Sequence, residues 1–233
     1  MNINNNHQII EDWQREVNIM SKLRSPYLAE IFGYSWEPSG TIVTIIMEFF
    51  PLGDLFKVLH REKHVYLSLP QRIRMARHCA LAVYVLHKEG FIHRDIKSLN
   101  VLVADDFSCK LSDFGMAKMI KYEGSQATIV FNTEGKGTPV WMAPEVKNPQ
   151  QKISLYSFPA DIYSLGVVLF EILERSLPWD EIQGKVVFPP QYQSSGLLEP
   201  MLNPNPQLRP NATTVISNLD TYTRDIILSV HQM

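Results

Sequence analysis

The sequence predicts an α+β protein, and two observations support this class. Runs typical of β-strands come early in the chain and long helical patterns come late, so strands and helices are segregated instead of alternating. The chain has 233 residues, of which 45% are apolar. This is enough to bury a sizeable core, and it fits one large domain or two lobes.

The first part of the chain predicts one helix and one hairpin. Residues 1–9 are polar and rich in asparagine, so we expect a disordered end there. Apolar residues recur at helical spacing over residues 10–23, at Ile10, Trp13, Val17 and Met20. Two β-rich runs follow, LAEIFGYSW and TIVTIIMEFF, and the turn sequence EPSG between them predicts a hairpin.

The second part predicts mainly helices. Residues 70–89 form an amphipathic pattern that starts at Pro70 and stops before Gly90. Residues 160–173 (ADIYSLGVVLFEIL) are apolar almost all round, which is typical of a buried helix, and a last helix is expected near residues 211–228. Between them, VLVADD and CKLSDFG read as strands joined by a turn, and residues 116–140 read as a long loop.

Composition excludes several classes of function. The 22 basic and 24 acidic residues nearly cancel, so we do not expect nucleic acid as a partner. Cys79 and Cys109 are too few for a disulfide framework and are expected to be buried thiols of a reduced compartment. No apolar run reaches the roughly 18 residues of a membrane span, and MNINNNHQII is not a secretory leader. We expect a cytoplasmic protein with no membrane span.

Three motifs in the middle of the chain carry a family resemblance. HRDIKSLN occupies residues 93–100, DFG residues 113–115 and APE residues 143–145. In order and approximate spacing they resemble the signature set of the protein kinases. The resemblance covers residues 10 to 228 and implies a two-lobe kinase-like fold with a mainly helical C-terminal lobe. It also implies transfer of the γ-phosphoryl group of ATP to protein hydroxyls.

Residues 93–100, called the HRD loop below, contain groups suited to this reaction. Phosphoryl transfer depends mostly on positioning and charge neutralisation. By the resemblance, Asp95 accepts or orients the proton of the substrate hydroxyl, and Lys97 brings a cation to the transferred group. Asn100 and Asp113 hold Mg²⁺, which prefers hard oxygen ligands. A lone Asp or Lys in a loop is usually a solvated charge, but the combination favours the catalytic interpretation.

Other motif residues have structural roles in this family. The resemblance stacks His93 and Phe114 with Ile31 and Met20 in a column between the lobes. It also gives Asp161 the role of binding the backbone around His93 and Arg94, although an acid at a helix start is favourable in any case.

One ion pair is also implied by the resemblance. Glu145 and Arg209 are expected to form a buried pair that fastens the end of the activation loop, and such a pair is better evidence of architecture than of stability.

The resemblance also places the nucleotide, against Met47, Glu48, Phe50, Asp54, Leu55 and Leu102. Met47 is expected at the back of the pocket, and Glu48 to Phe50 form the hinge whose backbone meets adenine. Leu55 and Leu102 form the apolar floor, with Asp54 near the ribose. Each apolar residue, taken alone, is more often simply part of a core.

Two stretches indicate a subgroup. GTPVWMAPE (residues 137–145) and HRDIKSLN resemble the tyrosine-kinase-like group, the Raf and mixed-lineage relatives, which are mostly serine/threonine enzymes. Lys97 is also typical of the serine/threonine type. Thr138 is expected to bridge toward Asp95 and Lys97. Candidate phosphorylation sites that pair with Arg94 once charged are Ser125, Thr128 and Thr133.

The chain departs from the family pattern in two places. Glu16 matches the helix glutamate that pairs with the nucleotide-binding lysine, yet the first lysine is Lys22 and the first glycine is Gly33. The glycine-rich loop and the lysine strand of the family pattern therefore have no match ahead of Glu16, and we predict a truncated N-terminal lobe. The segment from Trp179 to Arg209 is also short, with little room for a helix that docks protein substrates.

These observations predict a residual small lobe over residues 10–50, a helical large lobe over residues 51–228 and a tail over residues 229–233. Three interpretations stay open: a piece of a longer active kinase, a short kinase with weak activity, or a pseudokinase that serves as a scaffold or binding module. The expected partners are ATP and a protein substrate with serine or threonine. Self-association through the exposed edge of the small lobe is also expected.

Overall fold

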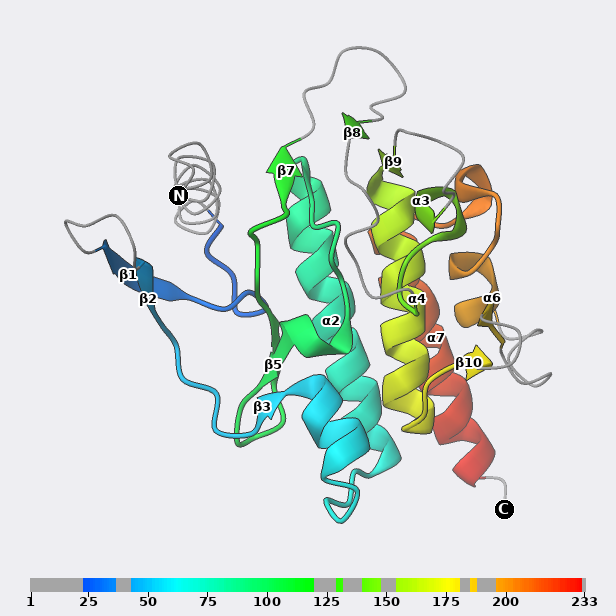
Figure 1. Cartoon of the computed structure of the whole chain (residues 1–233). Helices are drawn as coiled ribbons and strands as arrows, with labels where there is room; N and C mark the ends of the chain where they lie inside the picture. The colour runs from blue at the N-terminus through cyan, green and yellow to red at the C-terminus, as the bar shows by residue number, and fades with distance from the viewer. Residues whose placement is uncertain are drawn as a thin grey trace.

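The computed structural model describes residues 23–36, 43–119, 129–131, 140–147, 154–180, 185–187 and 196–231. Within these residues, helices pack beside small antiparallel sheets, which confirms the predicted α+β class. Figure 1 shows three long helices side by side. The hairpin of β1 (Ile31–Trp36) and β2 (Val43–Met47) lies on the other side of the molecule from the last of them, α7 (Ala212–His231). The predicted helix over residues 10–23 and the EPSG turn lie almost entirely outside the described residues.

Helix α2 (Leu69–Lys88) begins and ends within one residue of the predicted range 70–89. The Ser68 side chain accepts a hydrogen bond from the Gln71 backbone amide while Gln71 bonds back to the Ser68 amide, a capping box with Pro70 in the first turn. At the other end Gly90 has φ +78°, a conformation that costs glycine little. One face of the helix, including Met75, Ala80 and Leu86, is buried.

Helix α4 (Phe158–Glu174) is the centre of the core. Residues from Ala160 to Leu173 are buried except for the half-buried Ser164, as the all-apolar pattern predicts. A Cβ atom on Gly166 would lie 3.0 Å from Leu202 Cδ2, so this glycine allows the short helix α6 (Leu198–Met201) to approach closely. Nearly complete burial makes α4 the element on which the other parts are positioned.

Helix α7 (Ala212–His231) lies against α2 and confirms the last predicted helix, with an end three residues later. Before it come α6 and the 3₁₀ turn η3 (Pro206–Leu208). Among the described residues between Trp179 and Arg209, α6 is the only α-helix, and it has four residues.

One three-stranded sheet supports the middle of the chain. Its order is β3 (Gly53–Asp54), β5 (Val101–Val103) and β6 (Cys109–Leu111), all antiparallel. The turn after β5 includes Phe107 at φ +63°. Strands β5 and β6 confirm the predicted pair VLVADD and CKLSDFG.

Three further antiparallel pairs are short. They are β4 (Phe91–Ile92) with β7 (Lys118–Met119), β8 (Ile129–Phe131) with β9 (Ser154–Tyr156), and β10 (Trp179–Asp180) with β11 (Lys185–Val186). Residues 116–140 were predicted as loop, so β7 and β8 are a correction. Pairing with distant strands, not local periodicity, produces them, and each has only two or three residues.

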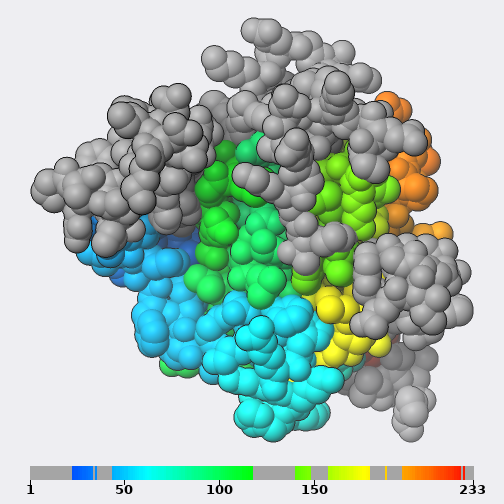
Figure 2. Space-filling view, viewed as in Figure 1, coloured from blue at the N-terminus to red at the C-terminus, as the bar shows by residue number. Residues whose placement is uncertain are grey.

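The hairpin of β1 (Ile31–Trp36) and β2 (Val43–Met47) confirms the early strand prediction. Strand β2 ends at Met47, three residues before the apolar run does. The hairpin joins the rest of the molecule through the preceding segment, where the Ala29 amide donates to Leu111 O at 2.9 Å and the Leu111 amide to Tyr27 O at 2.9 Å. Figure 2 shows the surface of residues around 91–119, in green, between the blue-to-cyan hairpin side and the yellow-green residues of α4.

Both cysteines are free and buried, as predicted. The contact with Cys79, together with burial, raises the pKa of the Cys109 thiol well above its ordinary value. In the part of the chain that the structure describes, no helix combines the length and apolar character needed to cross a bilayer.

Candidate active site

The HRD loop connects β4 to β5 and brings three of the predicted catalytic residues together. Lys97 Nζ donates to Asp95 Oδ2 at 2.6 Å. Asn100 Nδ2 donates to the same Oδ2 at 3.0 Å and to the Asp95 carbonyl at 2.8 Å. The Asp95 carboxylate is thus held by two side chains, with one oxygen left to face another group.

Asp113 is placed next to this loop through its neighbour Ser112. The Ser112 amide and hydroxyl both donate to the Asn100 carbonyl, at 2.8 and 2.9 Å. Asp113 itself is exposed and has φ +61°, a left-handed conformation that is uncommon outside glycine. Among the described residues, no hydrogen bond joins its carboxylate to Asp95, Lys97 or Asn100.

The donor set at Asn100 and Asp113 fits a hard divalent cation. Because Asn100 uses its Nδ2 on Asp95, its Oδ1 is the atom left for a ligand, and Asp113 supplies an exposed carboxylate. Within the described ranges no group of three His, Cys, Asp or Glu side chains forms a metal cage. Two protein oxygens are nevertheless typical for Mg²⁺, which keeps waters and takes phosphate oxygens for its other positions.

Asp161, in the first turn of α4, holds the start of the HRD loop. Its Oδ2 accepts the His93 amide at 2.8 Å and its Oδ1 the Arg94 amide at 2.9 Å, as the resemblance implied. His87 Nε2, at the end of α2, lies 3.0 Å from Oδ2. Burial alone raises the pKa of this carboxyl, but the hydrogen bonds from His87 and from the His93 amide, with the electrostatic interactions of the two residues, outweigh it and leave the pKa below its ordinary 3.8.

His93 is a buried packing residue, in agreement with the prediction. Its ring is fully buried and meets Phe114 edge to face, with centroids 5.1 Å apart. Nε2 lies 3.1 Å from the Ser112 carbonyl, which only accepts, and Nδ1 accepts the Asp95 amide. The ring is therefore the neutral Nε2–H tautomer, and burial lowers its pKa. Ile31 packs against the same core, whereas Met20 lies outside the described residues.

The predicted pair of Glu145 and Arg209 is present. Arg209 donates Nη1 to Glu145 Oε1 at 2.7 Å and Nη2 to Oε2 at 2.8 Å, a bidentate geometry. Its side chain is fully buried and also donates to the carbonyls of Asn203 and Pro159. The pair fixes the end of residues 140–147, called the APE segment below, which include helix α3 (Pro144–Lys147).

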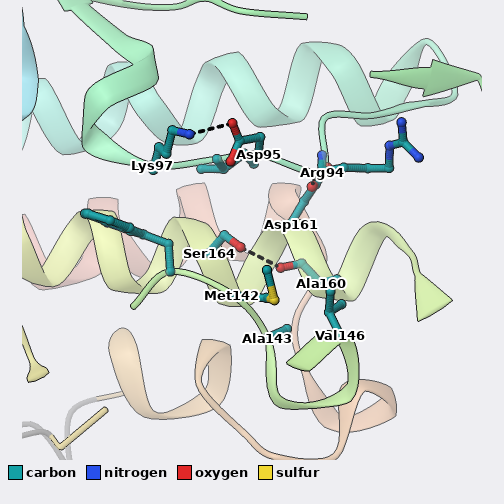
Figure 3. Close-up of a pocket in the computed structure, with 11 residues that line it drawn as sticks. Arg94, Asp95, Lys97, Met142, Ala143, Val146, Ala160, Asp161 and Ser164 are labelled. Carbon is teal, nitrogen blue, oxygen red and sulfur yellow. Dashed lines mark hydrogen bonds and ion pairs between the residues drawn. The ribbon is translucent and has the colours of Figure 1, made fainter. Parts of the chain in front are cut away.

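A small cavity lies between the HRD loop and the APE segment. Figure 3 shows Arg94, Asp95 and Lys97 on one side, Met142, Ala143 and Val146 on the other, and residues of α4 between them. Its volume of about 20 Å³ is enough for roughly one water molecule. The predicted bridge from Thr138 to this region, Glu16 and the three candidate phosphorylation sites lie outside the described residues.

Comparison with known proteins decides the family. The protein kinase domain family matches residues 2–219. The chain belongs to the protein kinase family. Members of this family generally use ATP and Mg²⁺.

Relatives in Dictyostelium discoideum agree with this assignment. This kinase domain is 30% identical over 229 residues to a probable serine/threonine-protein kinase, covering 92% of this chain and 24% of the relative. It is 32% identical over 236 residues to the probable serine/threonine-protein kinase drkA, covering 94% and 34%. It is 37% identical over 175 residues to the dual specificity protein kinase shkC, covering 72% and 31%. The chain thus spans about a quarter to a third of the length of these relatives.

The predicted hinge of this kinase domain follows β2 directly. The Glu48 amide donates to Glu30 O at 2.9 Å, and its carboxylate accepts Lys110 Nζ at 2.8 and 2.7 Å. Phe49 is 83% exposed, whereas Phe50 is buried in the core. Met47 is half-buried at the end of the strand. The Glu48 side chain therefore ties the hinge to β6.

The remaining nucleotide-binding candidates lie on β3 and β5. Asp54 stands opposite Leu102 in the strand register, and its Oδ1 accepts the Lys57 amide at 2.8 Å. Leu102 is half-buried, but Leu55 is fully buried. Leu102 and Asp54 therefore lie nearer to solvent than Leu55 and Phe50, which pack inside the core. Their roles toward ATP stay predictions.

Sequence reasoning missed several polar residues that join these elements. Glu171 is fully buried on α4 and contacts Ser98, Trp141 and His60. Its signal was visible as the single charge in the apolar run YSLGVVLFEIL. Lys110, the partner of Glu48, is likewise the charge in the middle of the strand CKL.

Proposed function

We propose that this chain is the catalytic domain of a serine/threonine-protein kinase that transfers the γ-phosphoryl group of ATP to hydroxyls of a protein substrate. The observation that carries the proposal is the contact set around Asp95: Lys97 at 2.6 Å and Asn100 at 3.0 Å from one carboxylate oxygen. A carboxylate held in this way keeps a fixed direction, which a base that must meet an incoming hydroxyl requires.

In the proposed mechanism each residue has one task. Asp95 accepts or orients the proton of the substrate hydroxyl with the oxygen that is free of Lys97 and Asn100. Lys97 keeps a cation beside the transferred group. Asn100 and Asp113 would hold Mg²⁺, which would supply neutralisation of charge on the phosphates. Asp161 keeps the loop in place by accepting the His93 and Arg94 amides.

The nucleotide is proposed to bind between the hinge and β5. Glu48 to Phe50 offer backbone groups to adenine, Met47 limits the back of the pocket, and Asp54 lies near the ribose. Leu102 is proposed as the apolar floor. Because Leu55 and Phe50 are buried, their contribution is to support this floor from behind.

The subgroup is proposed from the motifs. GTPVWMAPE, HRDIKSLN and Lys97 favour the tyrosine-kinase-like group with serine/threonine specificity. Two of the relatives named above are called probable serine/threonine-protein kinases and one is called a dual specificity protein kinase. We also propose a cytoplasmic location, because the two thiols are free and buried as in reduced compartments.

The test is phosphoryl transfer from labelled Mg-ATP to a general protein substrate, followed by phosphoamino-acid analysis. Label on serine or threonine is expected, and label on tyrosine alone would overturn the proposed specificity. Asp95→Asn is the matched control, since it keeps the shape of the side chain and removes its charge. Equal transfer by this variant would show that Asp95 is not the catalytic group.

The alternative function, a pseudokinase or scaffold, gives a different result in the same experiment. A folded chain that binds Mg-ATP or a protein partner but transfers no label, with or without Asp95, would support it and contradict the kinase proposal.

A further inference from the structure

Glu171 is a buried acid that the proposed mechanism does not use. Its side chain is fully buried on α4. Ser98 Oγ donates to Oε1 at 2.8 Å, and His60 Nε2 lies 2.9 Å from the same oxygen. Trp141 Nε1 donates to Oε2 at 2.5 Å. Both carboxylate oxygens are therefore occupied by side chains.

These three partners come from three separate parts of the chain. Ser98 starts the 3₁₀ turn η2 (Ser98–Asn100) within the HRD loop. Trp141 lies at the start of the APE segment. His60 lies in η1 (Lys57–Arg61), the π-helical turn that follows Asp54 and Leu55. One carboxylate on α4 is thus the common attachment point of the loop, the segment and the turn.

Burying an acid is costly unless it is well paired, so this arrangement needs a reason. Core packing alone does not require a charge, since an apolar side chain of similar volume fills the same space. The neighbours of its partners indicate the reason. Ser98 lies in the HRD loop between Lys97 and Asn100, which both contact Asp95. Trp141 lies in the APE segment directly before Met142 and Ala143, which line the cavity. Lys97 and Trp141 also line the cavity between the HRD loop and the APE segment.

We propose that Glu171 is a positioning residue that fixes the separation between the HRD loop and the APE segment, and thereby the seat of the protein substrate. This rests on the proposed function. Ser98 and Trp141 are its direct contacts on the two sides. His60 is the third contact, and it links the turn after Asp54 to the same carboxylate.

Two substitutions of Glu171 distinguish a positioning role from a role in stability alone. Glu171→Gln keeps the shape and one acceptor. Glu171→Met fills a similar volume but leaves the Ser98 hydroxyl and the Trp141 indole N–H without their acceptor, so a loss of stability is expected and is measured separately from activity. A purely structural acid predicts that activity follows stability in both variants. A positioning acid predicts that the Met variant stays folded and still loses activity.

The main experiment measures kcat, the KM for a peptide substrate, the KM for ATP and the urea midpoint for each variant. For Glu171→Met we expect kcat/KM for the peptide to fall by roughly tenfold or more, the size of losing a hydrogen bond to a charged group. The KM for ATP is expected to change much less. Glu199→Gln, an exposed acid on α6, is the control and is expected to leave all four quantities unchanged. A peptide kcat/KM that stays at the wild-type value in Glu171→Met overturns the proposal.

Rescue at His60 provides a second test. His60→Gln retains a group that can hydrogen-bond to Glu171, and His60→Phe does not. We expect the Phe variant to lose peptide kcat/KM several times more than the Gln variant. In the double variant with Glu171→Met, the His60→Phe effect is expected to vanish, because both act through one contact. Additive effects would contradict the proposal.

Hydrogen exchange distinguishes failure of this proposal from failure of the proposed function. It needs no turnover. In Glu171→Met, faster exchange is expected in residues 93–100 and 140–147 but not in the distant hairpin. If the wild-type chain transfers no phosphate and this pattern is found, the kinase proposal fails and the positioning role stands. Unchanged exchange in both segments would overturn the positioning role.

Discussion

The HRD loop and the β1–β2 hairpin are attached to the molecule by contacts of different kinds. The loop has buried polar residues, His93, Ser98 and Asn100, and two buried acids of α4 hold it, Asp161 and Glu171. Each anchor satisfies backbone or side-chain groups that would otherwise be buried without partners.

The hairpin has fewer such anchors among the described residues. Phe32 and Ile46 are 65% and 56% exposed, and Phe49 in the hinge is 83% exposed. Backbone bonds from residues 27–29 to Leu111 and the pair of Glu48 with Lys110 join it to the large lobe. The predicted chemistry therefore lies in a rigidly bound part of the molecule, and the predicted adenine contact lies where few buried groups resist local opening.

The largest expected effect is a difference in stability when one isoleucine in each region is replaced by alanine. Ile92 on β4 is fully buried, so Ile92→Ala is expected to lower the free energy of unfolding by about 2–5 kcal/mol. Ile46→Ala on β2 is expected to change it by less than about 1 kcal/mol, because that side chain is mostly exposed. Urea unfolding of both variants measures the contrast, and equal losses would show that the hairpin is as tightly packed as the loop.

Analytical sedimentation of the Ile92→Ala and Ile46→Ala variants tests the predicted self-association. If the exposed hairpin edge drives it, Ile46→Ala is expected to weaken the association. An unchanged association constant would place the contact elsewhere.

The regions also differ in how far the sequence alone predicted them. The groups around Asp95 were predicted because the HRDIKSLN motif contains them, and the contacts of Asp161 and Glu145 because the family resemblance implies their roles. Helices α2, α4 and α7 were predicted because periodicity and caps are local signals.

The missed features depend on contacts between distant parts of the chain. Strands β7 and β8 form by pairing with β4 and β9, and two or three residues carry no readable pattern. The contact of His60 with Glu171 joins residues 111 positions apart. A lone charge in an apolar run indicates that a partner exists, but it does not say which residue that partner is.

The next effect concerns pH, and it is expected at the HRD loop and not at the hairpin. Burial lowers the pKa of His93 below its ordinary 6.5. At pH values between the lowered pKa of His93 in the folded chain and its ordinary 6.5, the unfolded chain binds a proton that the folded chain does not. The free energy of unfolding therefore falls as the pH falls below 6.5. His93→Phe is expected to be less stable at neutral pH but to lose less stability on acidification. Urea unfolding at a series of pH values measures this slope.

Two features of the chain sharpen this measurement. The pKa of His78 on α2 is also lowered, first by burial and then by Arg74, so His78→Gln is the comparison that separates the two histidines. Staying above about pH 5 avoids Asp161, whose lowered pKa affects stability below its ordinary 3.8. Residues 23–50 contain no histidine. Amide exchange rates in the hairpin, corrected for the intrinsic effect of pH on exchange, are therefore not expected to rise on acidification before those of the HRD loop. An unchanged slope in His93→Phe would mean that the ring titrates normally in the folded chain.

The smallest effect expected is at the pair that joins the hinge to β6. The Lys110 and Glu48 side chains are 19% and 29% exposed, so Lys110→Met is expected to cost only about 0.2–1 kcal/mol of global stability. Its local effect is expected to be larger, because the carboxylate of Glu48 loses its partner at 2.7 Å while the backbone bond to Glu30 remains. Amide exchange in residues 44–50 is therefore expected to become faster, with residues 93–100 unchanged, and the KM for ATP is expected to rise if the hinge meets adenine. Lys57→Met is the control, since Lys57 and Glu62 form an ion pair within and next to η1, with side chains 41% and 29% exposed, and neither residue belongs to the hinge. If both variants change exchange in residues 44–50 equally, or if Lys110→Met loosens the HRD loop as well, the hinge and the loop are not attached independently.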